Sequence, residues 1–436
     1  MQSPKKDKSS EIVEHLFRRE AGRITSVLTR IFGIENIELA EDVVQDTILK
    51  ALQQWPYSGI PDNPSAWLFR SAKNKAIDIL RRNRLNNKYS EEISTLFESE
   101  WKLGAQIDEF FSENEIIDDQ LRMIFTCCHP KLPPESQIAL ALKNLCGFSI
   151  KEVAKAFLTN EATINKRLSR AKDKIRSGTI KFEIPAGIEL ERRIKNILST
   201  LYLLFNEGYN SSKQDILIRE DLIKESIHLA ELLIEHPITE NNYRSEIYAL
   251  LALMYLHYAR TPARIDDSGN ILLLKDQDRN LWDRKLIAKG MKYLEKSASG
   301  DKLSEYHLQA GISYFYATAE NFEKIEWGKI LNLYNLLYKM NGSAIVGLNR
   351  AIVVSQLLGA ETAIDEIKKL ANKSSGERLE NYYLYHSTLG ELHFQTGNYS
   401  EAKTCFEKAI QMTSSEIEKK LLHGKLGKII SAESKL

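Results

Sequence analysis

The chain has 436 residues, of which 43% are hydrophobic and 27% are charged, and its formal net charge is +1. This composition is typical of globular proteins and excludes a fibrous or wholly disordered chain. A net charge so close to zero also excludes a uniformly basic nucleic-acid-binding surface, so any contact with nucleic acid must come from local basic patches.

The sequence contains no signal for a membrane or for a metal. Its N-terminus, MQSPKKDKSS, lacks an apolar core, and the most apolar run, Tyr248 to Ala259, is shorter than the ~20 residues that a membrane span needs. The four cysteines form no CxxC pair, and no second ligand pair follows Cys127-Cys128-His129. We therefore expect a cytoplasmic protein with reduced thiols, no membrane contact and no cofactor.

The first strong helical pattern runs from Leu39 to Trp55. Apolar or small residues recur along it and predict one buried face: Ala40, Val43, Val44, Thr47, Ile48, Ala51, Leu52 and Trp55. The opposite face carries Glu41, Asp42, Gln45, Asp46 and Leu49. Acidic faces are usually only solvated, but an apolar residue such as Leu49 among the acids indicates a protein partner.

A loop rich in turn formers is expected from Pro56 to Ser65, with Asn63 as the cap of the next helix and Pro64 at its first position. That helix continues to about Arg84 and has a strongly basic face: Arg70, Lys73, Lys75, Arg81, Arg82 and Arg84 stand against Asp78 alone. A basic helix after a polar loop that contains Tyr57 is suited to holding single-stranded nucleic acid.

Acidic residues dominate from Glu91 to Asp119, where Leu96, Phe97, Trp101, Phe110 and Phe111 are interspersed. We interpret residues 86–119 as an acidic linker whose structure depends on a partner.

The segment Gly147 to Arg176 predicts a helix-turn-helix. Ser149 and Glu152 have capping-box spacing, and Asn160 or Thr159 can cap the second helix. In that second helix Ile164, Leu168, Ala171 and Ile175 share one side, and the other side carries Asn165, Lys166, Arg167, Ser169, Arg170, Lys172 and Lys174. A helical hairpin with a merely solvated basic face is the alternative, but caps, turn length and apolar spacing all favour DNA binding.

After Pro185 the chain consists of amphipathic helices. Leu389, Gly390, Gly397, Tyr399, Ala402, Phe406 and Ala409 have the spacing of a tetratricopeptide repeat, and a more degenerate copy begins at Ser343. Between Thr261 and Lys285 we expect a turn at Asp267 to Asn270, and local ion pairs around Trp282 among Asp276, Asp278, Arg279, Asp283 and Arg284.

Three of these segments together resemble bacterial sigma factors of the extracytoplasmic-function group. AEDVVQDTILKAL is similar to the part that binds RNA polymerase, NPSAWLFRSAKNKAIDILRR to the minus-ten reading region, and GFSIKEVAKAFLTNEATINKRLSRAKDKIR to the minus-thirty-five reading region. LYLLFNEGY, ARTPARIDDSGNILLLKDQDRNLWDR and the terminal repeats resemble the subgroup with a long helical C-terminal extension.

The resemblance implies an all-α protein with two sigma-type domains, residues 1–85 and 120–180, and a helical-repeat domain at 186–436. It also implies a partner for each surface. Core RNA polymerase would be bound by Glu41, Asp42, Gln45, Asp46 and Leu49, and promoter DNA by Arg70, Lys73, Asn74, Arg81, Arg82, Glu161, Asn165, Lys166, Arg167 and Arg170. The C-terminal domain would regulate initiation through a protein partner.

Two other functions are open at this point. A helix-turn-helix regulator with a tetratricopeptide sensor would bind duplex DNA without polymerase, but it leaves residues 39–84 unexplained. A scaffold whose basic helices are plain surface explains neither basic cluster. An enzyme is not expected, because no nucleophile triad, phosphate loop or metal-ligand cluster occurs in the sequence.

Overall fold

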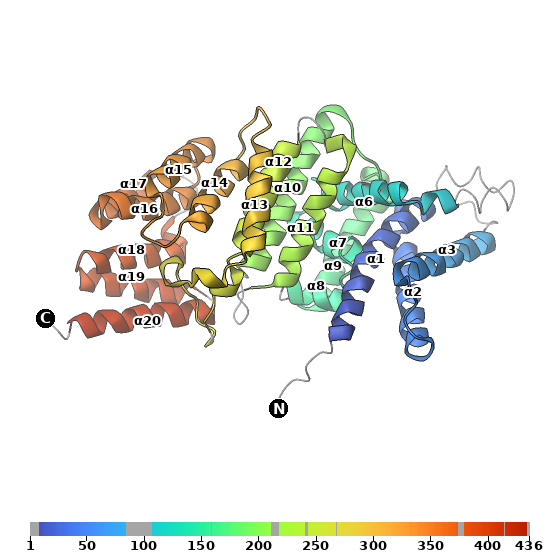
Figure 1. Ribbon diagram of the computed structural model, residues 1–436, viewed down its shortest axis with the longest axis horizontal. Helices are drawn as coiled ribbons and strands as arrows, with labels where there is room; N and C mark the ends of the chain where they lie inside the picture. Colours follow the sequence, from blue (N-terminus) through green and yellow to red (C-terminus); the bar gives the residue numbers. More distant parts are fainter. Residues whose placement is uncertain are drawn as a thin grey trace. The chain divides into compact units, whose positions relative to one another are not determined.

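The computed structural model describes residues 8–83, 107–157, 159–210, 218–239, 243–266, 268–373, 379–413 and 415–433 (Figure 1). The predicted all-α fold is confirmed: the described residues form helices, and the one β-bridge among them joins Ile265 to Ile271. The chain divides into two compact units, residues 1–201 with 235–238 and residues 202–234 with 239–436. Both units are therefore helical, and each is described separately below.

The first unit contains α1 (Lys8–Phe32), η1 (Ile34–Asn36), α2 (Ile37–Ser58), α3 (Pro64–Asn83), α6 (Glu113–Cys127), α7 (Pro134–Asn144), α8 (Ile150–Phe157), α9 (Glu161–Lys174), η3 (Ile175–Thr179) and the first part of α10 (Gly187–Tyr209). We call α1 to α3 the first lobe and α7 to α9 the second lobe.

The core of the first lobe is built on aromatic contacts between its three helices. The ring of Trp55 on α2 lies 5.3 Å from Phe17 on α1 and 5.6 Å from Trp67 on α3. The predicted buried face of α2 is correct at most positions, but Leu52 is 53% exposed. The contact with α1 and α3 is narrower than the apolar stripe, so a residue at the edge of the stripe stays outside the core.

The α2 helix continues through Pro56 to Ser58, so the loop expected from Pro56 is shorter than predicted. A proline in the last turn removes a single backbone donor, and the helix tolerates that loss near its end. Gly59, with φ of 80°, then reverses the chain where a residue with a Cβ would be strained.

The end of the expected acidic linker is packed. Ile107 and Phe110 belong to the core of the first lobe, and the ring of Phe111 meets Phe69 edge-on at 6.0 Å. Helix α6 begins at Glu113, so the predicted boundary between residues 119 and 120 falls inside a helix. Residues 86–106 of the linker lie outside the described residues.

The second unit contains the end of α10, α11 (Glu220–Glu235), η4 (Pro237–Thr239, of which Thr239 belongs here), α12 (Arg244–Tyr258), η5 (Thr261–Ala263), η6 (Leu274–Asp276), η7 (Arg279–Leu281), α13 (Arg284–Ser297), α14 (Glu305–Thr318), α15 (Trp327–Asn341), α16 (Ala344–Leu358), α17 (Ala360–Lys373), η8 (Leu379–Asn381), α18 (Tyr383–Gln395), α19 (Tyr399–Met412) and α20 (Glu416–Glu433). From α13 on, each helix packs against the next (Figure 1).

The predicted repeat helices are α18 and α19. A Cβ on Gly390 of α18 would lie 3.0 Å from the ring of Phe406 on α19, so a side chain there would press on the ring, and glycine favours the close crossing of the two helices. In the degenerate copy, Ala351 of α16 and Ala363 of α17 are both buried, as their spacing predicted.

The ion pairs expected around Trp282 are absent from the described residues; other hydrogen bonds take their place. Asp283 caps α13 by accepting from the amides of Lys285 and Leu286 at 2.8 and 3.1 Å. Arg279 donates to the carbonyl oxygens of Tyr316 and Ala319 at 2.9 and 2.7 Å. The prediction was wrong because aspartate side chains readily accept hydrogen bonds from nearby backbone amides, and an arginine can donate to backbone carbonyl oxygens instead of pairing with carboxylates.

Candidate nucleic-acid interface

The helix-turn-helix forms as its caps predict. Ser149 and Glu152 make a reciprocal capping box: the amide of Ser149 lies 2.8 Å from the Glu152 carboxylate, and the amide of Glu152 lies 3.2 Å from the Ser149 hydroxyl. Asn160 caps α9 by accepting from the amide of Thr163 at 2.8 Å. These bonds satisfy backbone donors that a helix start otherwise leaves open, so both helices begin where the sequence indicates.

The predicted DNA-reading residues of α9 divide into an exposed group and one restrained arginine. Glu161, Asn165, Lys166 and Arg170 are exposed. Arg167 instead pairs with Glu135 of α7 at 2.5 Å, and its guanidinium lies 5.3 Å from the ring of Phe157. Reading a base with Arg167 would therefore require this pair to open, whereas Arg170 is already accessible.

Helix α3 presents the second basic surface. Asn63 caps it by accepting from the amide of Ala66 at 3.0 Å, directly before Pro64. Arg70, Asn74, Arg81 and Arg82 are exposed. Lys73 forms an ion pair with Asp108, so one predicted cation is partly neutralised by the segment before α6. Tyr57, 93% exposed, stands at the end of α2 close in sequence to this surface.

The predicted polymerase-binding residues do not all share one environment. Asp42, Gln45, Asp46 and Leu49 are exposed, and Asp46 pairs with Lys75 of α3. The Glu41 side chain is only 11% exposed and lies between Lys143 and Lys172 of the second lobe. This carboxylate therefore faces the helix-turn-helix in the described structure.

Lys172 was expected on the exposed basic side of α9 but is buried, with 7% exposure. Its ammonium lies 3.0 and 3.1 Å from the two oxygens of Glu41 and 3.7 Å from Glu38. Sequence periodicity missed this position because it identifies the main buried stripe of a helix and cannot identify a second, charged contact beside it.

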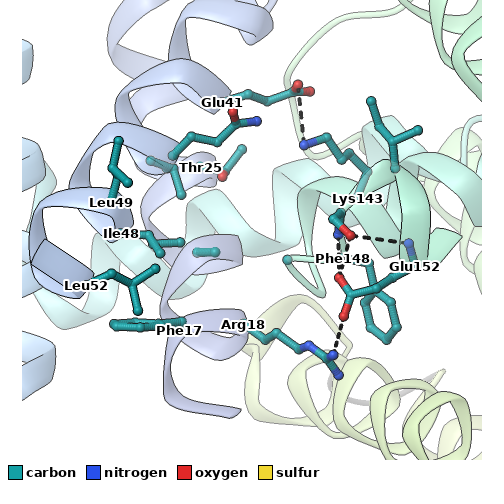
Figure 2. A pocket seen from close by; sticks show the side chains of 16 residues that line it. Phe17, Arg18, Thr25, Glu41, Ile48, Leu49, Leu52, Lys143, Phe148 and Glu152 are labelled. Carbon is teal, nitrogen blue, oxygen red and sulfur yellow. Dashed lines mark hydrogen bonds and ion pairs between the residues drawn. The ribbon is translucent and has the colours of Figure 1, made fainter. Parts of the chain in front are cut away.

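A pocket of about 500 Å³ lies where the first and second lobes meet (Figure 2). Ile48, Leu49 and Leu52 of α2 line one side, and Lys143, Phe148 and Glu152 of the second lobe line the other. Glu152, the capping residue of α8, also pairs with Arg18 of α1, which lies 4.8 Å above the ring of Phe148. The pocket contains three of the predicted polymerase-binding residues, Glu41, Gln45 and Leu49.

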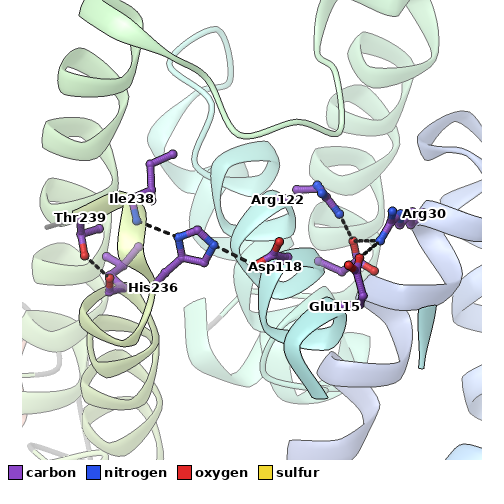
Figure 3. Close-up of polar contacts among 9 residues, drawn as sticks. Arg30, Glu115, Asp118, Arg122, His236, Ile238 and Thr239 are labelled. Atoms are coloured by element: carbon purple, nitrogen blue, oxygen red, sulfur yellow. Dashed lines mark hydrogen bonds and ion pairs between the residues drawn. The ribbon is translucent and has the colours of Figure 1, made fainter. Parts of the chain in front are cut away.

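Helix α6 is joined to α1 by buried charges (Figure 3). Arg30 of α1 pairs with Glu115 and lies 3.8 Å from the fully buried carboxylate of Asp119. Burial raises the pKa of Asp119 to about 7, although Arg30 and Arg122 both oppose the rise. The carboxylate of Asp118, the residue before Asp119, lies 2.8 Å from the imidazole of His236.

The second unit has a groove lined by both charged and apolar residues. It consists of two adjoining pockets of about 490 and 310 Å³, and both are lined by Leu273, Lys275, Glu391 and Lys425. The first is bordered by Lys275, Lys420, Lys425 and Lys428, with Ile271, Leu273, Phe394 and Leu421 as apolar walls. The second is bordered by the aromatic residues Tyr316, Phe322 and Trp327. No sequence pattern predicted this groove, because its residues come from separate segments between Asn270 and Lys428.

Among the described residues, no group of three or more histidine, cysteine, aspartate or glutamate side chains is placed to hold a metal ion. None of the described helices is long and apolar enough to cross a membrane.

The chain matches four families. Residues 16–85 match Sigma-70 region 2, residues 122–175 match Sigma-70 region 4, residues 193–298 match a family of unknown function, and residues 383–415 match the tetratricopeptide repeat. The sigma matches coincide with the first lobe and with α6 to α9.

Similar proteins agree with these matches. An uncharacterized protein of Rhizobium meliloti is 36% identical over 385 residues, which are 88% of each chain. The ECF RNA polymerase sigma-E factor of Haemophilus influenzae is 26% identical over 162 residues, or 37% of this chain and 83% of its own. The protein of the same name in Escherichia coli K12 is 26% identical over 135 residues, or 31% of this chain and 70% of its own. The chain belongs to the extracytoplasmic-function sigma factors, in a branch with a long helical C-terminal extension that contains a tetratricopeptide repeat.

Proposed function

We propose that this sigma factor binds core RNA polymerase in the cytoplasm and directs promoter-specific initiation. The observation that carries the proposal is the pairing of two separate, well-capped basic helices, α3 and α9, with an acidic helix, α2, in one compact unit. Exposed Asp42, Gln45, Asp46 and Leu49 would contact polymerase. The exposed cations of α3 would hold the melted strand, and those of α9 would read duplex DNA.

The alternative, a helix-turn-helix regulator that binds closed duplex on its own, needs only α8 and α9. It gives no role to the exposed basic face of α3 or to the exposed acids of α2. Run-off transcription with purified core polymerase on genomic fragments separates the two functions. A sigma factor yields specific transcripts only when both proteins are present, whereas the regulator would protect its site from nuclease without polymerase and start no transcript.

The second unit would regulate initiation by contact with a protein partner. Its groove supports this role, because four lysines border a pocket with apolar walls, and an acidic peptide with apolar side chains would complement both. Lys425 already pairs with Glu391 at 2.7 Å, so Lys420 and Lys428 are the better positions for charge reversal. Full-length K420E/K428E should change transcription in cells, while run-off transcription with purified polymerase stays as in the wild type. If the variant and the wild type have equal transcription activity in cells under all inducing conditions, the groove has no role in regulation.

A further inference from the structure

One wall of the groove in the second unit is a hairpin that local hydrogen bonds hold in shape. The amide of Asp266 donates to the carbonyl oxygen of Asn270 at 3.0 Å. The Asp266 carboxylate accepts from the amides of Ser268 and Asn270 at 2.9 and 2.7 Å. The Arg264 guanidinium lies 3.9 Å from the centre of the Tyr209 ring, and this contact holds the hairpin on the end of α10. Since Asn270 lines the first pocket, this side of the groove is preformed.

Helix α20 supplies cations to the same pocket. Lys420, Gly424 and Lys428 are four residues apart and therefore lie on one side of the helix. A Cβ on Gly424 would meet no atom within 4 Å, so the space between the two lysines is open. Both lysines are exposed. The pocket lining has four lysines and two acids, Asp276 and Glu391, so the pocket attracts anions.

The second pocket is an aromatic one. The ring of Trp327 meets the rings of Tyr316 and Phe322 edge-on at 5.9 and 5.3 Å, and these contacts hold the three rings in place. Ile352 of α16, which is 40% exposed, also lines this pocket. A volume of about 310 Å³ is enough for one aromatic side chain, which has only two χ angles to fix and therefore binds at a low cost in entropy.

The two pockets meet at Glu391 and Lys425, so a ligand that fills both has an aromatic group directly beside its anionic groups. Acidic peptides and nucleic acids both offer this combination. Glu391 favours the peptide, because the backbone amides of a peptide can donate to a carboxylate, whereas a phosphodiester backbone has no N–H donor and is repelled. The apolar walls at Ile271 and Leu421 also suit side chains better than phosphates.

We infer that the groove recognises an acidic peptide through one aromatic anchor residue. The aromatic ring enters the pocket of Tyr316, Phe322 and Trp327, and carboxylates next to it in the peptide pair with Lys420 and Lys428. The inference rests on the proposed regulatory role of the second unit and adds the kind of sequence that its partner presents.

Fluorescence anisotropy with short labelled peptides tests this recognition in the full chain. The probes are peptides in which a single phenylalanine moves through a run of aspartate and glutamate. The controls are the same peptides with alanine in place of phenylalanine, and with asparagine and glutamine in place of the acids. At least one acidic phenylalanine peptide should bind tenfold more tightly than either of its controls, and added salt should weaken it. If no peptide of the set exceeds its controls, the inference is wrong.

Charge reversal locates the acids of the peptide. K420E/K428E should weaken the best peptide at least tenfold. K403E/K408E is the matched control, because Lys403 and Lys408 are exposed on α19 and line neither pocket. Equal affinities of the two double variants would place the peptide outside the groove.

A neutral change in the second pocket locates the aromatic anchor. I352N should weaken the phenylalanine peptide several-fold and leave the alanine peptide unchanged, because only the ring contacts this wall. I345N is the control: Ile345 is also exposed on α16, at 46%, and does not line the pocket. If I352N weakens both peptides equally, the groove binds acids without an aromatic anchor and the inference is wrong. Polymerase is absent from these titrations, so their failure leaves run-off transcription, which tests the sigma function, unchanged.

Discussion

Arg193 on α10 donates a hydrogen bond to the backbone carbonyl of Phe125 on α6, and its guanidinium lies 5.4 Å from the centre of the Phe125 ring. Further along the same helix, Asn196 donates to the carbonyl of Cys128 at 2.6 Å. The first part of α10 therefore covers the end of α6. A chain that ends after Pro185 loses these contacts, so we expect α10 to contribute to the stability of the region that contains α6.

Replacing Arg193 by alanine tests this dependence. The Phe125 carbonyl would lose its buried donor, which costs about 1 to 3 kcal/mol. Hydrogen exchange of the full chain should show faster exchange in α6. R192A is the matched control, because Arg192 is 68% exposed and lies 4.0 Å from Glu189. Equal exchange in the two variants would show that α10 only connects the units.

Reversing the charge of Asp42 should weaken binding to core polymerase by a few kcal/mol, because a lysine would meet a partner surface that complements acids. Asp42 is exposed, and Asp46 is less suitable because it also pairs with Lys75. Titration of labelled D42K with core polymerase measures the loss. Glu295, exposed on α13, provides the control variant E295K. Unchanged affinity of D42K would take α2 out of the polymerase interface.

On α9, Arg170 should matter for sequence preference more directly than Arg167. Arg170 is exposed, whereas Arg167 is engaged with Glu135. If Arg170 contacts a guanine with both nitrogens, R170A should cost about 1 to 3 kcal/mol on the preferred promoter and relax selection at one base. Binding to a set of single-base promoter variants measures both effects. Uniform weakening on every sequence would assign Arg170 to a phosphate.

Acid should destabilise the second unit through His257. Burial, with Arg260 and Arg264 nearby, lowers the pKa of His257 to about 3, while an unfolded histidine titrates near 6.5. The unfolded chain therefore binds more protons between these values, and stability falls as the pH decreases through that window, by about 1.4 kcal/mol per pH unit. Measured by urea unfolding, the free energy of unfolding should decrease less between pH 6.5 and pH 5 in H257Q than in the wild type. Equal slopes would mean that His257 protonates without unfolding.

A branched side chain at Gly390 should destabilise the repeat formed by α18 and α19. A valine there would press on the ring of Phe406, and such overpacking typically costs about 1 to 3 kcal/mol. Gly424 on α20 is the control, because a Cβ at that position meets no atom within 4 Å. In thermal unfolding, the midpoint temperature of G390V should be lower than that of the wild type, whereas the midpoint temperature of G424A should equal or exceed it. If the midpoint temperature of G390V equals that of the wild type, the two helices can move apart without loss of stability.

Local features of this protein were predictable from the sequence because their partners lie within a few residues. The capping box of Ser149 and Glu152, the Asn160 cap and the Asn63-Pro64 start each depend on groups in one helical turn, and all three are confirmed. The sigma and tetratricopeptide regions were recognisable for the same reason, since their motifs are continuous segments.

The environment of a side chain outside the main apolar stripe was decided by tertiary structure. Lys172 and Glu41 are 131 residues apart, and each lies on a charged helix face that the sequence assigns to solvent or to a partner. Leu52 has the spacing of a core residue but is 53% exposed. Periodicity determines which side of a helix is apolar, whereas only the packing of distant helices determines where that side ends and which charges become buried beside it.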